Sequence, residues 1–319
     1  MCHRVGIIDN GKLIALDRPA NLLASTGSHV VEEVDGRGQS WFFESREKAT
    51  EHAGFKPNRR QTMNPLTPWV AIYFQAGVVL YVVAALASFF RIGLAALSVL
   101  ALGLVLNFIS IGLKLYLSWP MQAPFQEPFW LPAALAVLVL GIHKHGRPVL
   151  AGHLLVLTAV LALIAALFPS DYYLPFPRSN TIVAHIFLPM SVIGKACFYA
   201  AGVAALMFLA QHNETLKQDR TRPLFGRFTV WGFVIFTLSL FLAETWSYLG
   251  WASPVIWNNA TMTSTMAVWF YYGCFLHLYL LRAWPARRRA WFALAGVPLL
   301  VVFTLLPETG GFKWPEWLS

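Results

Sequence analysis

Eight long stretches of this chain are almost free of charge, and no other feature constrains the fold as strongly. They lie at about 69–90, 93–117, 128–143, 149–168, 182–210, 227–247, 263–282 and 288–306. Runs of about 20 apolar residues are typical of transmembrane helices, because such a helix can cross the hydrocarbon core of a bilayer. Only 12% of the 319 residues are charged, about half the fraction of an ordinary soluble domain. We therefore predict an all-α, polytopic transmembrane helix bundle with about eight spans. Stretch 128–143 is short enough to tilt or to be partly re-entrant.

Basic residues gather in every second connection between these stretches. The clusters are Lys144 with Arg147, then Lys217, Arg220, Arg222 and Arg227, then Arg282 with Arg287, Arg288 and Arg289. Short loops rich in Lys and Arg remain on the cytoplasmic side of a membrane, so the connections 119–127, 169–181 and 248–262 are predicted to face outward. Topology thus explains the net charge of +9, and we expect no nucleic acid partner. The pattern predicts a multi-pass protein of the cell's inner (cytoplasmic) membrane.

Residues 1–62 differ in character from the rest of the chain, because they are polar and charged. Residues 5–8 and 13–16 are predicted as two strands joined by an Asp-Asn-Gly turn, followed by a short helix after Pro19. We therefore divide the chain into a short α+β-like segment, 1–62, and a transmembrane domain, 63–319. With eight spans the N-terminus would lie outside, although 56–60 is basic. Two interpretations stay open: a relic or misassigned start, with Met63 as the true first residue, or a genuine appended module.

The first 25 residues, which include VGIIDNGKLIALDRPANLLAS, resemble the C-terminal part of ABC-transporter ATPases. The chain carries no G-x-x-x-x-G-K-[ST] loop to bind phosphates, so we expect no ATP hydrolysis. It also carries no Ser-His-Asp, paired-carboxylate or HExxH pattern, and its three cysteines are far apart in the sequence. Independent catalysis is therefore not predicted.

Tryptophans concentrate in the last third of the chain, and a histidine follows them. Trp246, Trp251 and Trp257 lie between two apolar stretches, and Trp269 and His277 follow in the second of these. A histidine within a transmembrane helix is costly and marks function by default, and a flat aromatic ligand such as haem would suit these neighbours. Two plainer interpretations stay open: an aromatic belt at the membrane surface and a histidine that hydrogen-bonds between helices.

The stretch MAVWFYYGCFLHLYLLRAWPARRRAWFALAG, with Trp269, Tyr272, Leu276 and His277, resembles the cytochrome c assembly family of CcsA/ResC-like, tryptophan-rich (WWD) membrane proteins. The resemblance runs from about 70 to 310 and includes the helix that opens with His185. It implies that haem b is bound, with His277 and His185 as ligands of the haem iron and Trp246, Trp251, Trp257 and Trp269 around it. It also implies delivery or presentation of haem at the outer face, together with a second assembly subunit in the membrane and apocytochrome c.

The chain departs from that family pattern at the outer site. Asn258 and Asn259 stand where the family has Trp-Asp, and no second outer histidine follows the last stretch. His277 should lie about 15 Å deeper than His185 along its helix, so the two histidines should serve different haems. A second ligand for His277 would come from a partner subunit or from His145 or His153. Two alternatives stay open: a haem-free regulatory or scaffolding subunit of the same family, and an ABC-type permease subunit.

Three further charges, Lys114, Lys195 and Glu244, fall within or beside the apolar stretches. Charged groups in a membrane pair with one another or line a functional path. The sequence leaves open whether these residues form structural pairs, bind the carboxylates of haem in the case of the lysines, or line a polar pathway.

Overall fold

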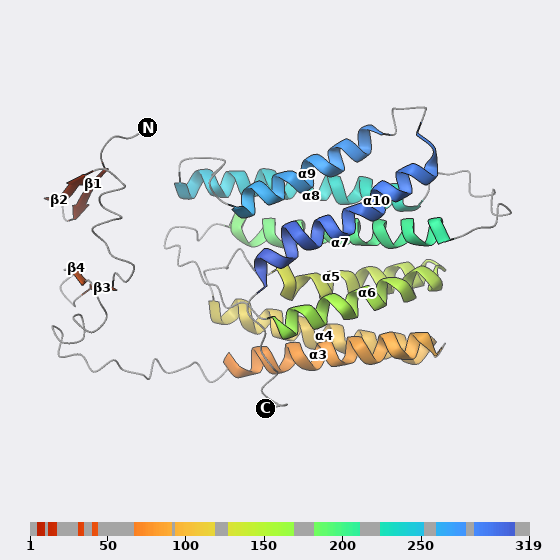
Figure 1. The fold of residues 1–319 in the computed structure, drawn as a ribbon. Helices are drawn as coiled ribbons and strands as arrows, with labels where there is room; N and C mark the ends of the chain where they lie inside the picture. The colour runs from red at the N-terminus through yellow and green to blue at the C-terminus, as the bar shows by residue number, and fades with distance from the viewer. Residues whose placement is uncertain are drawn as a thin grey trace. The chain divides into compact units, whose positions relative to one another are not determined.

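The computed structural model of the chain (Figure 1) describes residues 5–9, 12–17, 31–34, 40–43, 67–90, 93–118, 127–168, 182–210, 224–251, 260–278 and 284–309. The chain divides into two compact units, Met1–Met63 and Asn64–Ser319.

The first unit contains two antiparallel hairpins among its described residues. Strand β1 (Val5–Asp9) pairs with β2 (Lys12–Asp17), and β3 (Val31–Val34) pairs with β4 (Ser40–Phe43). The first hairpin confirms the two predicted strands. The expected helix after Pro19 lies outside the described residues. The nature of this unit, whether relic or appended module, stays a prediction.

The second unit is a bundle of helices, and all eight predicted apolar stretches are helical in the described residues. The helices are α3 (Thr67–Phe89), α4 (Gly93–Ser118), α5 (Glu127–Lys144), α6 (Pro148–Leu167), α7 (Ile182–Ala210), α8 (Leu224–Trp251), α9 (Ala260–His277) and α10 (Ala286–Leu300). Helix α10 continues as a π-helix, η2 (Val301–Leu305), and a 3-10 turn, η3 (Leu306–Glu308). The predicted all-α polytopic bundle is confirmed.

Helix ends follow the local sequence. Gly146 adopts a positive φ of 74° between α5 and α6, a conformation that glycine adopts without strain from a Cβ atom. Pro148 is the first residue of α6, where its missing N–H costs nothing because that group would be unpaired in any case. Pro285 precedes α10 with an extended backbone. These glycine and proline residues therefore mark helix boundaries.

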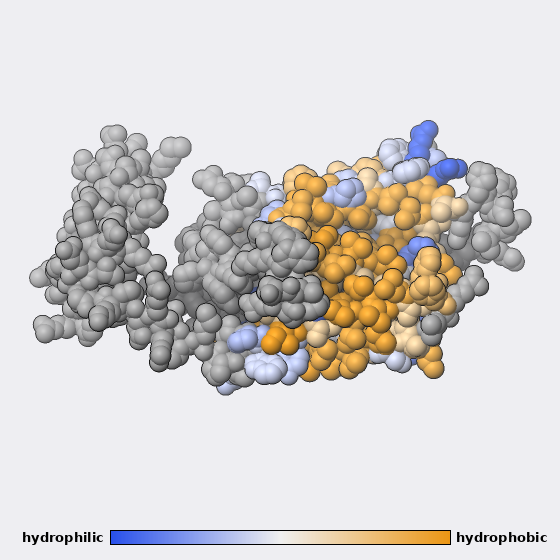
Figure 2. Space-filling model, turned by 60° about the horizontal axis from the view of Figure 1, so that its bottom comes forward, coloured by the Kyte–Doolittle hydropathy of each residue, from blue (hydrophilic) through white to orange (hydrophobic). Residues whose placement is uncertain are grey.

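In the part of the chain that the structure describes, six helices are long and apolar enough to cross a membrane: α3, α4, α6, α7, α8 and α10 with its extension. Helices α5 and α9, with 18 residues each, are long enough for such a span but are not apolar enough. Helix α5 begins with Glu127 and ends with His143 and Lys144, and α9 carries three threonines and a serine. Figure 2 shows hydrophobic residues over the middle of one face of the bundle and hydrophilic residues toward its ends. The second unit is that of a multi-pass membrane protein.

Helix α7 lies at the centre of the bundle. It packs against α8, α10 and α5, while α3 packs against α4 and α6. A Cβ atom on Gly194 of α7 would lie 2.9 Å from the Cβ of Phe236, and one on Gly232 of α8 would lie 2.9 Å from the Gly194 carbonyl oxygen. Small residues allow transmembrane helices to approach closely. This pair of glycines therefore fixes how α7 and α8 pack.

Candidate functional site

His185 and His277 lie toward opposite ends of the bundle. His185 is in the first turn of α7, and His277 is the last residue of α9. Helices α7 and α9 run in the same direction, with α8 antiparallel to both (Figure 1). An 18-residue helix is about 27 Å long, which is far more than two axial ligands of one iron allow. This arrangement agrees with two separate sites, and the role of each histidine stays a prediction.

His277 is exposed at the surface of the described bundle, although the sequence suggested a buried side chain. The difference arises because α9 packs against α8, α10 and η2 with its other faces. Its Nδ1 lies 2.8 Å from the carbonyl oxygen of Gly273, one turn earlier. If Nδ1–H donates to that carbonyl, Nε2 keeps the lone pair that a metal ion needs. In that tautomer, Nε2 would be the atom available to a metal ion, and the role of His277 as a ligand stays a prediction.

His145 and His153 share this geometry but lie elsewhere. Their Nδ1 atoms are 2.7 Å and 2.8 Å from the carbonyl oxygens of Gly141 and Val149, and both side chains are exposed. Helix α6, which carries His153, packs against α5, α3 and α7, whereas α9 packs against α8, α10 and η2. The described bundle therefore does not bring these histidines to His277. The local hydrogen bond is common to all three, so it does not by itself identify a ligand.

Trp246 lies at the same end of the bundle as His185. Its ring centroid is 5.6 Å from that of Phe187, which follows His185 by two residues on α7. Trp246 is buried, with 8% of its surface exposed, because the end of α8 packs against the start of α7. Trp251 is the last residue of α8, and its side chain lies outside the described part. Trp257 lies outside the described residues.

Trp269 joins α9 to α8. Its Nε1–H donates to Thr237 Oγ1 at 2.9 Å, and its ring stacks on Phe233 with centroids 5.7 Å apart. This side chain is half-buried. Both its indole N–H and its ring therefore contribute to packing between the two helices, and its predicted place beside a haem stays a prediction.

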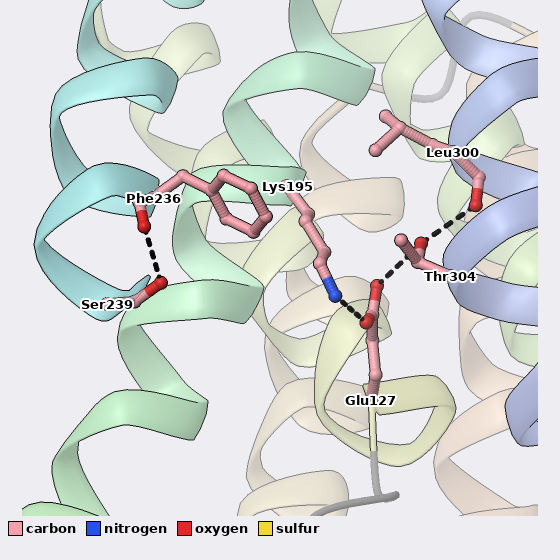
Figure 3. Close-up of polar contacts among 6 residues, drawn as sticks. All are labelled: Glu127, Lys195, Phe236, Ser239, Leu300 and Thr304. Carbon is pink, nitrogen blue, oxygen red and sulfur yellow. Dashed lines mark hydrogen bonds and ion pairs between the residues drawn. The ribbon is translucent and has the colours of Figure 1, made fainter. Parts of the chain in front are cut away.

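A buried polar cluster forms a further candidate site, and the sequence indicated only part of it. Lys195 of α7 forms an ion pair and hydrogen bond with Glu127 Oε2, and Thr304 Oγ1 of η2 lies 3.3 Å from Glu127 Oε1. Figure 3 shows the Glu127 carboxylate between Lys195 and Thr304. Glu127, Lys195 and Thr304 expose 1%, 5% and 5% of their surfaces. The structure therefore favours pairing for Lys195, one of the roles that the sequence left open.

Two lysines of the bundle lie beside aromatic rings. The Lys195 ammonium lies 5.8 Å from the ring centroid of Phe236, and the Lys114 ammonium lies 4.8 Å from that of Phe129.

Glu127 was not identified as a site residue from the sequence. Glu127 directly precedes Pro128, at the point where a loop was expected to end. The sequence does contain a signal for Glu127: a single acidic residue stands directly before one apolar run, and a lysine stands inside another apolar run.

The fold and these sites define a multi-pass helical membrane protein with histidines at both ends and a buried ion pair between its helices. Residues 69–310 match the family described as cytochrome C assembly protein, and the chain belongs to this family. It is also similar to the cytochrome c biogenesis protein CcsA of Synechococcus sp. (strain RCC307), with 31% identity over 118 residues. That match covers 36% of this chain and 37% of the relative. The predicted family resemblance is thus confirmed; the likeness of residues 1–25 to an ATPase stays a prediction.

Proposed function

We propose that this protein binds haem b and delivers or presents it at the outer face of the inner (cytoplasmic) membrane during cytochrome c assembly. The observation that carries this proposal is the family match over 69–310, which includes His185, His277 and the tryptophan-rich stretch between them. Both histidines belong to helices of the bundle, so the scaffold could hold an iron ligand at each end.

His277 suits the inner haem for two physical reasons. Its Nδ1 is close to the Gly273 carbonyl oxygen, which favours Nε2 as the free ligand atom. Because His277 is exposed, a group outside this bundle, such as a second assembly subunit in the membrane, could supply a further ligand to the iron. The absence of a nearby histidine on α8 or α10 in the described residues agrees with this division of ligands.

The outer end suits presentation of haem to apocytochrome c. His185, Phe187 and Trp246 lie there together, at the end where the tryptophan-rich connection joins α8 and α9. Bound haem would supply the vinyl groups that react with the client's cysteines, while this chain would hold and orient the macrocycle. Because Asn258 stands beside Trp257 in place of an acidic residue, we propose that the outer site holds haem more weakly than the inner site.

The absorbance spectrum of the purified full chain tests this function. We expect a Soret band at substoichiometric haem content, largely lost in His277→Ala and less affected in His185→Ala. The matched control is His153→Ala, because His153 is exposed and has the same contact of Nδ1 with a backbone carbonyl. That variant should keep the wild-type spectrum.

Two outcomes would contradict the proposal. Protein without any Soret band, even when haem is supplied and a partner subunit is co-expressed, would favour the haem-free scaffolding alternative. Equal losses in His277→Ala and His153→Ala would mean that general damage to the bundle, rather than loss of an iron ligand, explains the change.

A further inference from the structure

Helix α5 starts deep inside the bundle rather than at its end. Its first residue, Glu127, contacts Lys195, which lies near the middle of the 29-residue α7. The first N–H groups of a helix lack intrahelical partners and carry partial positive charge. In membrane transporters, helix starts at this depth point toward anionic groups of the substrate. A buried helix start in this position is therefore a candidate anion site, provided that other groups point to a ligand.

Donors from two other elements converge on the same place. Lys195 of α7 donates to Glu127, and the Thr304 hydroxyl of η2 lies 3.3 Å from the other carboxylate oxygen (Figure 3). The Thr304 hydroxyl is also 2.8 Å from the Leu300 carbonyl oxygen. Thr304 belongs to a π-helical segment, and such segments are frequent at functional sites. The carboxylate of Glu127 thus lies among groups of α5, α7 and η2.

Tyr199 provides a second, independent observation. It follows Lys195 by one turn on the same face of α7, and it is close enough to Glu127 for an electrostatic interaction. Its side chain is fully buried, and its hydroxyl has no hydrogen-bond partner among the described residues. Buried hydroxyls are nearly always paired. The O–H of Tyr199 therefore requires an acceptor that the described side chains do not provide.

Donors exceed acceptors in this cluster. An ammonium group has three N–H donors, and within the described residues its acceptor is Glu127. A second oxygen acceptor would satisfy both the remaining lysine donors and Tyr199. The positive end of α5 would also favour an anion over a neutral group.

We propose that Lys195, Tyr199, Thr304 and the start of α5 form a binding site for a ligand carboxylate, and that Glu127 occupies this site when the ligand is absent. The ligand carboxylate would replace the Glu127 side chain as the partner of Lys195, and it would accept a hydrogen bond from the Tyr199 hydroxyl. The assignment of that carboxylate to a haem propionate rests on the proposed function. The other source with the same chemistry is a fatty acid from the membrane.

A purely structural ion pair would need no ligand, so the test must separate the two roles. Tyr199→Phe removes one hydroxyl that has no partner in the described bundle and keeps the ring. A structural role for the cluster predicts no change in this variant. A carboxylate site predicts weaker binding, because one hydrogen bond to a charged group is lost.

The experiment measures binding of iron protoporphyrin IX and of its dimethyl ester to the purified full chain by absorbance. The variants are Tyr199→Phe, Glu127→Gln and the neutral pair Glu127→Gln/Lys195→Met, with Lys144→Met, at the exposed end of α5, as the control. We expect Tyr199→Phe to weaken binding of the free acid by roughly tenfold or more, with no effect on the ester. Glu127→Gln should tighten binding of the acid, and adding Lys195→Met should reverse this gain.

Each outcome decides the proposal. Equal effects of Tyr199→Phe on acid and ester, or no effect on either, would overturn the carboxylate site while leaving histidine ligation intact. If the wild-type chain binds neither porphyrin, the proposed function fails, and thermal unfolding in dodecanoate against a neutral amphiphile decides the site separately. Stabilisation by dodecanoate that is lost in Tyr199→Phe would assign the site to a fatty acid. No such stabilisation would overturn it.

Discussion

Gly194 and Gly232 lie where α7 and α8 pack against each other, and neither position has room for a side chain. A Cβ on Gly232 would lie 2.8 Å from a ring carbon of Phe198 and 2.9 Å from the Gly194 carbonyl oxygen. We expect Gly232→Ala to lower the unfolding free energy by about 1–3 kcal/mol, because overpacking forces backbone shifts. Gly152→Ala is the control, since a Cβ there meets no atom within 4 Å. Thermal unfolding in detergent would compare them, and equal melting temperatures would contradict the packing argument.

Lys195 and Glu127 should show strong coupling when they are replaced separately and together. Lys195→Met leaves a buried carboxylate without its cation, which typically costs about 3–5 kcal/mol. Glu127→Gln/Lys195→Met removes both charges and should recover most of that loss, since neutral replacements of buried pairs are often tolerated. Unfolding of both variants in the same detergent measures the difference. Additive losses would show that the ion pair does not couple α5 to α7.

At the scale of single elements, the hydrogen bond from Trp269 to Thr237 helps to anchor α9 to α8. Thr237→Val leaves the half-buried indole N–H of Trp269 without its acceptor, at a cost of about 1 kcal/mol. Trp269→Phe in the same background removes the unpaired donor and keeps an aromatic ring against Phe233. Its melting temperature should therefore equal or exceed that of Thr237→Val alone. A further large loss in the double variant would indicate that the ring area of Trp269, rather than its N–H, holds α9.

The helices were predictable from the sequence. The depth of particular residues in the bundle, and the direction in which their side chains point, were not. Apolar runs identify all eight helices because uncharged stretches of this length have few other stable forms in a membrane. The short length of stretch 128–143 was the one sign that α5 starts inside the bundle. How deep Glu127 lies depends on its neighbours in space, which the sequence does not show. The exposure of His277 depends on which faces of α9 contact α8 and α10. Aromatic residues occur all round this helix, so its sequence does not show which face is buried. The partner of Lys195 required contacts between residues 68 positions apart.

At the scale of the whole molecule, the two units should be separable. The first unit, Met1–Met63, forms its own contacts, and its sequence provides no phosphate-binding loop. We expect a variant that begins at Met63 to insert, fold and bind haem as the full chain does. Membrane fractionation and the haem spectrum of that variant are the measurements. Loss of the folded protein on truncation would contradict the prediction, and ATP turnover by the full chain would separately contradict the relic interpretation.

The orientation of the bundle is the last prediction, and it follows from where the basic residues lie. Arg147, Arg227 and Arg287 belong to the starts of α6, α8 and α10, which meet at one end of the bundle (Figure 1). Loops rich in Lys and Arg stay cytoplasmic, so the opposite end, with His185 and Trp246, should face outward. This orientation is what presentation of haem outside the cytoplasm requires.

Single-cysteine labelling tests this orientation in a background that lacks the native cysteines. That background matters because Cys274 is exposed on α9 and would react by itself. In intact cells, an impermeant thiol reagent should label Ser253→Cys and should reach Ala286→Cys only after the membrane is opened. Trp246 and Arg287 lie at opposite ends of the described bundle, so one pair of positions reports on both faces. Labelling of Ala286→Cys but not Ser253→Cys from outside would reverse the topology and would put the tryptophan-rich connection in the cytoplasm, where it could not serve an outer haem site.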